Sequence, residues 1–335
     1  MKAEILRLLK ESDSYLSGQQ LCDRFQVSRT AVWKMIEQLK KDGYEIEAVR
    51  NKGYRLIHSP DVLSEEEIKS LVRTTWAGSH IIFRGEMDST NTQAKLLGEQ
   101  KAPHGTLVVT DRQIMGKGRR GRSWESPAGV CIYMSILLRP ELKPSSAPML
   151  TLVMALAAAE AVRKQTGLEA KIKWPNDLVL NGKKICGILT EMSAEPDYIN
   201  HVVIGVGINV NQTEFPPDIC DTATSLLLES EKMGETPWTC GKIRRAELLA
   251  AVMEEFEKYY EIFMETGNLS GLADRYNEML INRGREVKIL ESGNTYTAQA
   301  KGINDTGELL VCLPDGEERH IFAGEVSVRG VYGYV

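Results

Sequence analysis

The hydrophobic positions of residues 1–60 predict three short helices. In "AEILRLLKE" the apolar residues recur at helical spacing and fall on one stripe. Ser17 and Gln20 have the spacing of a capping box in front of a second helix, and Ser28 is placed to cap a third, "RTAVWKMIEQLKKDG". Only two residues separate the second helix from Ser28. The pattern therefore predicts a helix-turn-helix unit.

A β-hairpin is predicted directly after these helices, because two alternating runs in "YEIEAVRNKGYRLI" flank the turn "RNKG". Helices followed by such a basic hairpin resemble a winged-helix DNA-binding domain, in which one helix enters the major groove and the hairpin tip meets phosphates or the minor groove. Two alternatives to DNA binding remain. Trp33 alone could be a core residue at the rim of the unit, and the whole unit could be a protein-interaction module with a charged surface. The expected DNA contacts are Arg29, Thr30, Trp33, Lys34, Arg50 and Lys52.

From residue 61 to 281 the pattern changes to that of an α+β domain. Pro60 ends the first unit, and Ser64 is placed to cap a new helix. Asn181-Gly182, a strong hairpin signal, joins "DLVL" to "KKICGILTE". The stretch "MLTLVMALAAAEAV" is apolar on all sides and too short to span a bilayer, so it predicts a buried helix and no membrane segment. Strands are expected at 80–87, 106–113, 130–140 and 200–212, and helices at 88–100, 146–166, 241–265 and 267–281.

Residues 282–335 contain five short apolar runs separated by turns such as "NDTG" and "PDGE". Five short strands in about fifty residues are typical of a small β-barrel. The chain is therefore expected to form three domains, with boundaries 1–60, 61–281 and 282–335.

The composition is that of a globular protein, with 42% hydrophobic and 26% charged residues and a net charge of −5. The first sixty residues nevertheless carry 11 Lys and Arg against 8 Asp and Glu, which suits a DNA-binding unit in an otherwise acidic chain. The six cysteines are scattered without a CxxC pair, and the N-terminus lacks the pattern of a signal peptide. We therefore expect a cytoplasmic protein with neither a zinc site nor a disulfide framework.

The segment "GKGRRGRSW", residues 116–124, places four cations and three glycines in nine residues. Like charges at this density repel each other, so the segment is expected to be disordered when empty and ordered by an anion. Its glycines spell GxGxxG, but Pro127 and Gly129 follow where a dinucleotide-binding fold needs a helix. A dehydrogenase is rejected on that ground. The alternative is a solvated basic loop or a nonspecific nucleic-acid contact.

Four motifs together resemble the biotin–protein ligases: "DSTN" at 88–91, "RQ" with "GKGRRGRSW" at 112–124, "KWPND" at 173–177 and "GKKICGIL" at 182–189. With the winged helix in front, the chain is similar to the bifunctional biotin ligases that also repress the biotin operon. The resemblance implies a central mixed α/β sheet like that of class II synthetases and an SH3-like C-terminal barrel. It implies synthesis of biotinyl-5′-AMP from biotin and Mg²⁺-ATP, then transfer to a lysine of a biotin carboxyl carrier domain. It also implies operator binding by a homodimer with biotinyl-5′-AMP as corepressor.

The resemblance also assigns roles to individual residues. Arg119, Lys184 and Asp177 are the expected catalytic residues, with Asp177 accepting the proton of the incoming lysine. Many relatives have arginine where this chain has Lys117, which keeps the charge but loses bidentate geometry. Asn209 is the expected position of metal-side contacts to the Mg²⁺ of ATP. The expected biotin-binding residues are Ser89, Thr90, Asn91, Gln113, Gly116, Lys117, Gly118, Arg119, Lys184 and Gly187. The expected nucleotide-binding residues are Arg120, Trp124, Asn176 and Asn209.

Two other functions remain open on the residues alone. A lipoate-type acyl ligase shares the central fold and the two-step chemistry, although "KWPND" and "GRRG" favour biotin. A ligand-sensing repressor without catalysis is the second, although Arg119, Lys184 and Asn176 argue against lost chemistry.

Overall fold

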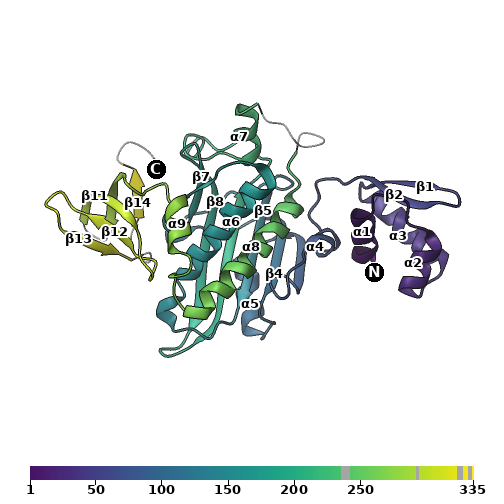
Figure 1. Ribbon diagram of the computed structural model, residues 1–335, viewed down its shortest axis with the longest axis horizontal. Helices are drawn as coiled ribbons and strands as arrows, with labels where there is room; N and C mark the ends of the chain where they lie inside the picture. The colour runs from purple at the N-terminus through teal and green to yellow at the C-terminus, as the bar shows by residue number, and fades with distance from the viewer. Residues whose placement is uncertain (235–241, 292–293, 323–326, 331–333) are drawn as a thin grey trace.

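The computed structural model describes residues 1–335 except 235–241, 292–293, 323–326 and 331–333. Cys240 and the start of the helix expected at 241–265 lie outside the described residues, as does the start of the last expected strand. Three units follow one another along the long axis, with the winged helix at one end and a small β-sheet at the other (Figure 1).

The N-terminal unit has the expected three helices and hairpin. The Ser17–Gln20 capping box is present, and the Ser28 hydroxyl accepts from the backbone N–H of Ala31. Val32 and Ile36 on the third helix are buried. The elements are α1 (Lys2–Glu11), α2 (Gly18–Phe25), α3 (Arg29–Lys41), β1 (Glu45–Val49) and β2 (Gly53–His58).

A seven-stranded mixed sheet forms the central domain, in the order β3-β4-β5-β9-β8-β7-β6. Strands β3 and β4 are parallel and the other neighbours are antiparallel. Asn181 and Gly182 adopt positive φ angles of 48° and 79° in the β7–β8 turn, as the hairpin signal predicts. The strands are β3 (Ile81–Met87), β4 (Thr106–Gln113), β5 (Cys131–Leu138), β6 (Lys171–Lys173), β7 (Asp177–Leu180), β8 (Lys183–Ala194) and β9 (Ile199–Asn209).

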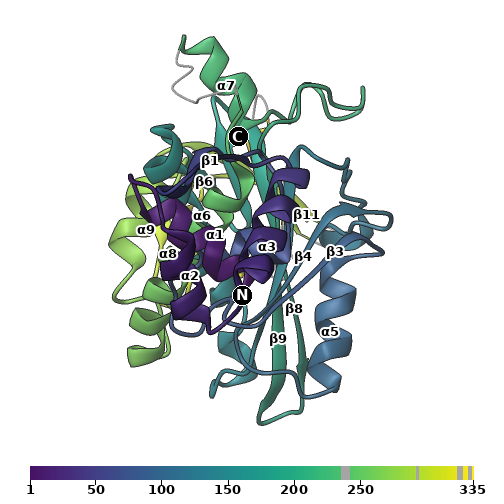
Figure 2. The ribbon, with the colours of Figure 1, turned by 90° about the vertical axis from the view of Figure 1, so that its right-hand side faces the viewer.

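Helices cover the two faces of this sheet unequally (Figure 2). The apolar helix α6 packs with α8 on one face, where Ile132, Met134 and Ile136 of β5 are buried. The expectation that this stretch is too short to span a bilayer was wrong, because within the described chain 144–166 is long and apolar enough to do so; it is, however, mostly buried in the core, as expected. Helix α5 covers only part of the other face. The helices are α4 (Glu65–Leu71), α5 (Thr90–Glu99), α6 (Met149–Thr166), α7 (Leu226–Lys232), α8 (Arg245–Thr266) and α9 (Ala273–Met279).

The five expected C-terminal strands are present as one antiparallel sheet, in the order β13-β12-β11-β10-β14. These strands are β10 (Glu286–Glu291), β11 (Asn294–Ile303), β12 (Leu309–Cys312), β13 (Glu318–Ile321) and β14 (Ser327–Gly330).

Three elements differ from the sequence prediction. The short strand β6 and helix α7 were not predicted, and the helix expected over 267–281 is reduced to Ala273–Met279.

Candidate functional site

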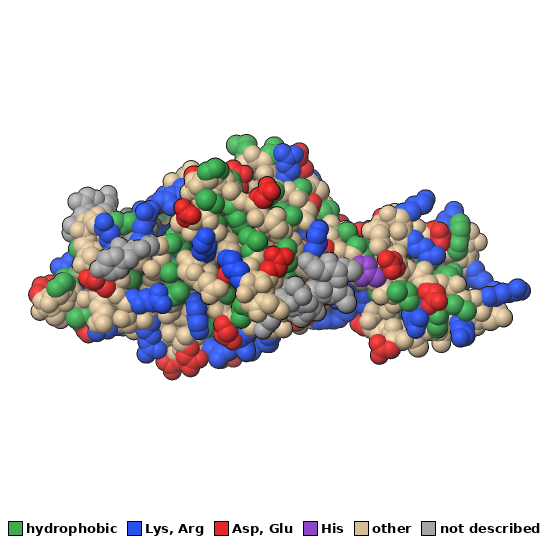
Figure 3. Space-filling model, turned by 90° about the horizontal axis from the view of Figure 1, so that it is seen from above, with side chains coloured by type: hydrophobic (Ala, Val, Ile, Leu, Met, Phe, Trp, Pro, Cys, Tyr) green, Lys and Arg blue, Asp and Glu red, His purple; other side chains and the backbone are tan. Residues whose placement is uncertain are grey.

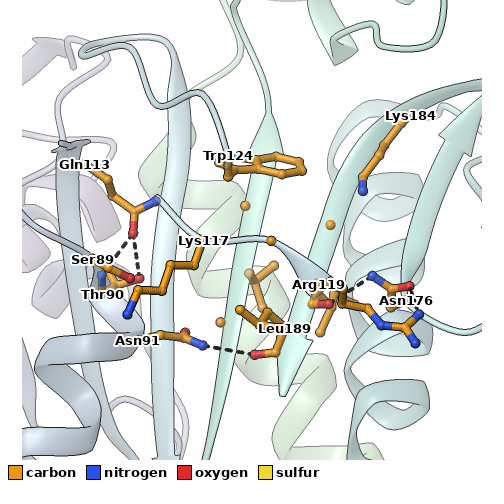
Figure 4. A pocket seen from close by; sticks show the side chains of 16 residues that line it. Ser89, Thr90, Asn91, Gln113, Lys117, Arg119, Trp124, Asn176, Lys184 and Leu189 are labelled. Atoms are coloured by element: carbon orange, nitrogen blue, oxygen red, sulfur yellow. Dashed lines mark hydrogen bonds between the residues drawn. The ribbon is translucent and has the colours of Figure 1, made fainter. Parts of the chain in front are cut away.

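A pocket opens on the face of the central sheet that α5 leaves partly uncovered. Eleven of the residues expected at the site line it, together with five that were not expected (Figure 4). The lining residues are Ser89, Thr90, Asn91, Gln113, Lys117, Gly118, Arg119, Trp124, Asn176, Lys184, Gly187, Ile188, Leu189, Gly205, Val206 and Gly207.

One end of the pocket is a cluster of neutral polar groups at the start of α5. The side-chain oxygen of Gln113 accepts from the backbone N–H of Thr90 at 2.9 Å. Ser89 precedes the first turn of α5, but its side chain makes no capping bond, and Gln113 accepts from the first N–H of the helix instead. Asn91 donates to the Leu189 carbonyl at 3.2 Å and to Glu191 at 2.8 Å. These groups offer both donors and acceptors to a neutral polar ligand.

Two further features shape this end of the pocket, and the first of them was missed by sequence reasoning. The Ser135 hydroxyl lies 2.7 Å from Thr90 Oγ1 and 2.6 Å from Asn91 Oδ1, in the middle of the apolar strand β5. A side chain at Gly205 would overlap the Asn91 amide. The only sequence signal for this second feature was a glycine inside a strand, which often marks close approach.

The other end of the pocket carries Arg119 and Lys184. Arg119 donates to Asn176 Oδ1 at 2.8 Å. Lys117 instead reaches back to α5, where it donates to Thr92 Oγ1 at 3.0 Å. Lys184 Nζ lies 2.6 Å from Asp177 Oδ1. The pocket therefore joins a neutral polar end to a cationic end, as an elongated ligand with one anionic terminus requires.

The carboxylate of Asp177 is buried behind Lys184 and does not itself line the pocket. Burial alone would raise its pKa, but Lys184 and Lys173 outweigh burial and lower the pKa overall. Asn176 adds a hydrogen bond of 3.1 Å to Oδ1. Asp177 is therefore held as an anion.

The indole of Trp124 forms part of the pocket floor. A Cβ at Gly187 or at Gly207 would lie 2.7 Å from its ring atoms, so both glycines make room for the indole. Gly187 was expected to admit a ligand, and in this structure it admits Trp124. The Lys184 ammonium lies 5.1 Å from the ring centroid, within the range of a cation–π interaction. The buried indole N–H has no partner among the described residues.

Three further expected residues lie beside the pocket. The backbone of Gly116 approaches the Trp124 carbonyl, so this glycine serves the loop's own fold. Arg120 lines a neighbouring depression with Arg119 and Asn176. Asn209 is buried and donates to the Thr224 carbonyl at 3.0 Å, which turns its amide away from the pocket. Among the described residues no group of three His, Cys, Asp or Glu could hold a metal ion.

The expected DNA contacts gather at the winged-helix end, where Lys and Arg side chains stand out from the surface (Figure 3). Trp33 is 53% exposed, which excludes a core role. Arg29, Arg50 and Lys52 line one groove between α3 and the hairpin tip. Arg29 donates to Gln19 at 2.8 Å, which orients its guanidinium beside the start of α3. This groove is a candidate phosphate-binding surface.

Comparisons with known proteins match all three units of the chain. Residues 85–209 match the Biotin/lipoate A/B protein ligase family, residues 2–55 a helix-turn-helix domain, and residues 284–329 the biotin protein ligase C-terminal domain. The chain is 40% identical to the bifunctional ligase/repressor BirA of Bacillus spizizenii, over 98% of each chain. It is 29% identical to BirA of Escherichia coli, over 97% of this chain and 96% of that one.

Among solved structures, the chain resembles the biotin protein ligase of Aquifex aeolicus in complex with biotin and ATP. The TM-score is 0.63 at 32% identity, over 75% of this chain and 99% of that one. The similarity to the Bacillus protein extends over the winged helix as well as the pocket-bearing domain.

Proposed function

The chain belongs to the family of bifunctional biotin ligase/repressors, and on this premise we propose that it attaches biotin to a carrier protein and represses transcription. Biotin and ATP react to biotinyl-5′-AMP and pyrophosphate, and the biotinyl group passes to a lysine of a biotin carboxyl carrier domain. The proposed compartment is the cytoplasm. The observation that carries the proposal is one pocket with a neutral polar end and a cationic end (Figure 4).

The neutral end suits the ureido ring of biotin, which has two N–H donors and one carbonyl acceptor. The amide oxygens and hydroxyls of Thr90, Asn91 and Gln113 match these groups in type. The wall of Ile188, Leu189 and Val206 suits the apolar part of biotin. In this orientation the biotin carboxylate points toward the cationic end.

In the first step an oxygen of that carboxylate attacks the α-phosphorus of ATP, and the bond to pyrophosphate breaks. The nucleophile, the phosphate and the leaving group are all anionic, so fixed positive charge lowers the barrier. Arg119 and Lys184 at the cationic end supply this charge. ATP brings Mg²⁺ as part of the substrate. Asp177 and Glu191 are each paired with a lysine, so phosphate oxygens are the expected main ligands of that ion.

In the second step the amine of the acceptor lysine attacks the acyl carbon, and AMP leaves. Asp177 was expected to take the proton of that amine. A carboxylate whose pKa is lowered and whose Oδ1 is bound to Lys184 is a weak base. This favours a role for Asp177 in holding Lys184.

Adenylate formation tests the ligase function directly. The purified protein is incubated with Mg²⁺-ATP and either biotin or lipoate, and the adenylate is identified by mass spectrometry. We expect biotinyl-5′-AMP, and then, with a carrier domain present, biotin on one lysine. Formation of lipoyl-AMP alone would identify the chain as a lipoate-type acyl ligase. Absence of any adenylate would favour a ligand-sensing repressor without catalysis.

Replacing Arg119 tests the role of the cationic end. Arg119→Ala should lower the rate of adenylate formation about 10²–10³-fold, by analogy with the loss of other charge-stabilising donors. Arg112→Ala is the matched control, because the Arg112 guanidinium is exposed and paired with Glu86 outside the pocket. Equal rates in the two variants would contradict the mechanism.

The repressor function links the pocket of the central domain to the winged helix. With biotinyl-5′-AMP as corepressor, ordering of the 116–122 loop prepares a surface at an edge of the central sheet for pairing with a second copy. The resulting homodimer binds the two half-sites of a biotin-operon operator. Sedimentation with and without biotin plus ATP tests this scheme, and a ligand-independent oligomeric state contradicts it.

A further inference from the structure

Residues 334–335, beyond the last strand of the small sheet, lie against the central domain. The chain's C-terminal end lies between β14 and the central sheet (Figure 1). The turn at Gly182 packs against Val335, whose Cγ2 would lie 3.3 Å from a Cβ added at that glycine. Gly330 at the end of β14 likewise leaves no room for a side chain beside the Val335 carbonyl. The segment 334–335 is therefore seated against both domains.

Tyr334 extends from this segment to the carboxylate behind Lys184. Its hydroxyl donates a hydrogen bond of 2.5 Å to Asp177 Oδ2. Its ring lies under Lys173, with the ammonium 4.0 Å from the ring centroid. Lys173 Nζ also lies 4.0 Å from Oδ2, while Oδ1 contacts Lys184 and Asn176. Each oxygen of Asp177 thus has its own partners.

We propose that Tyr334 is a positioning residue for the adenylation reaction, because it fixes Asp177 and thereby fixes the Lys184 ammonium at the pocket wall. This inference rests on the proposed ligase function. A carboxylate bound through one oxygen can turn about its Cβ–Cγ bond and carry its lysine partner with it. A second donor on the other oxygen holds the carboxylate plane, and short hydrogen bonds to charged groups are the strong ones.

The charged surroundings of Asp177 set the expected pH dependence. Burial raises its pKa, whereas Lys184, Lys173 and the Tyr334 hydroxyl lower it. Arg119 and Cys186 also face this carboxyl group, and Arg122 and Arg329 act on Tyr334. Loss of the Tyr334 hydroxyl removes one lowering contribution, so the pKa of Asp177 should rise. The pH below which Asp177 loses its charge, and with it its hold on Lys184, should then rise as well.

Tyr334→Phe tests the proposal, because it keeps the ring over Lys173 and removes only the hydroxyl. Biotinyl-5′-AMP formation is followed by pyrophosphate exchange between pH 3 and pH 8, because the pKa of Asp177 is lowered from the ordinary value of 3.8. We expect kcat to fall about 10–100-fold, the range for losing one hydrogen bond to a charged group. The KM for biotin should stay within about threefold, because the neutral end of the pocket is unchanged. The acid limb of kcat should move to higher pH.

Tyr296→Phe is the matched control, since it makes the same change on β11 at a residue outside the pocket. It should leave kcat and the acid limb as in the wild type. A wild-type kcat in Tyr334→Phe would overturn the proposal, and so would a lower kcat with an unmoved acid limb, which assigns Tyr334 to domain docking alone. A wild-type protein that forms no biotinyl-5′-AMP would overturn the ligase function and this role together.

Discussion

At the scale of single residues, Lys173 shows how burial changes the chemistry of a charged side chain. It is 6% exposed and lies against the ring of Tyr334. Burial lowers its pKa from 10.5 to about 8, against the raising effect of Asp177, while the neighbouring cations Lys184, Arg329 and Arg119 lower it further. A lysine in this state loses its proton near pH 8, well below the pH at which an exposed lysine does so.

This lowered pKa predicts a pH-dependent stability. Between about pH 8 and pH 10 the unfolded chain keeps a proton on Lys173 that the folded chain has lost, so stability rises with pH over this window. Below pH 8 Lys173 is protonated in both the folded and the unfolded chain, so it no longer contributes to the change of stability with pH. The free energy of unfolding of the wild type, relative to Lys173→Met, should therefore rise by up to about 1.4 kcal/mol per pH unit.

Urea unfolding at pH 7, 8, 9 and 10 measures this difference. Lys171→Met is the matched control, because Lys171 lies on the same strand and is more exposed. Parallel pH profiles for the wild type and Lys173→Met would show that Lys173 titrates normally.

At the scale of elements, the glycines of β9 shape the pocket. Gly205 leaves space for the Asn91 amide, and Gly207 leaves space for the Trp124 indole. Neither glycine has a positive φ angle, so a close approach of another group explains each of them, and backbone conformation does not. The two glycines of β9 therefore let Asn91 and Trp124, which come from different parts of the chain, pack directly against the strand backbone.

Gly205→Ala should displace Asn91 from the neutral end of the pocket. We expect biotin affinity to fall about 10-fold or more, and stability to fall by about 1–3 kcal/mol, the cost of overpacking a close contact. Isothermal titration with biotin and thermal unfolding measure the two effects. Gly85→Ala on β3 is the matched control, because a Cβ there meets nothing within 4 Å. Wild-type affinity in Gly205→Ala would contradict the assignment of Asn91 to the ligand.

Local signals predicted the elements where they were strong. The Ser17–Gln20 capping box and the Asn181-Gly182 turn have the predicted geometry. Helix α7 was missed although it had such a signal, since the Ser225 hydroxyl caps it by accepting from the Leu228 N–H. Strand β6 has only three residues, and its antiparallel pairing with β7 is what makes it a strand.

The pocket residues that could be predicted from the sequence are those that belong to a contiguous motif. Residues of the four motifs lie together as the resemblance implied. Ser135 was missed because a hydroxyl within an apolar strand gives no local pattern. Tyr334 was missed because 157 positions separate it from Asp177, and only the folded chain brings the two side chains together.

At the scale of the whole molecule, a buried arginine ties the segment after the winged helix to the central sheet. Arg245 is 2% exposed and binds Asp61 through its Nε atom at 2.9 Å. It also binds Asp111 on β4 at 2.7 Å and the Cys131 carbonyl at 3.1 Å. Asp111 lies two residues before Gln113 of the pocket. One side chain thus connects the interdomain segment to two strands of the central sheet.

Removing Asp61 should therefore cost much more than removing an exposed interdomain pair. Asp61→Ala leaves a buried guanidinium with one of its two carboxylates, and we expect a loss of about 3 kcal/mol or more in stability. Glu11→Ala removes the exposed ion pair between Glu11 on α1 and Arg73, which follows α4. This loss should lower stability by less than about 1 kcal/mol. Denaturant unfolding compares the two variants. Equal losses would show that Asp61 does not secure the junction.

A second contact fixes the winged helix itself: the buried carboxylate of Glu67 accepts from Lys10 at 2.5 Å and from Tyr44 at 2.6 Å. With Asp61 and Glu67 both engaged, α3 cannot swivel freely about its linker. If two copies pair through their central domains, the distance between their two α3 helices is therefore fixed. An operator lengthened by half a helical turn, about five base pairs, would present its second half-site on the opposite side of the duplex. The dimer should then fail to bind it.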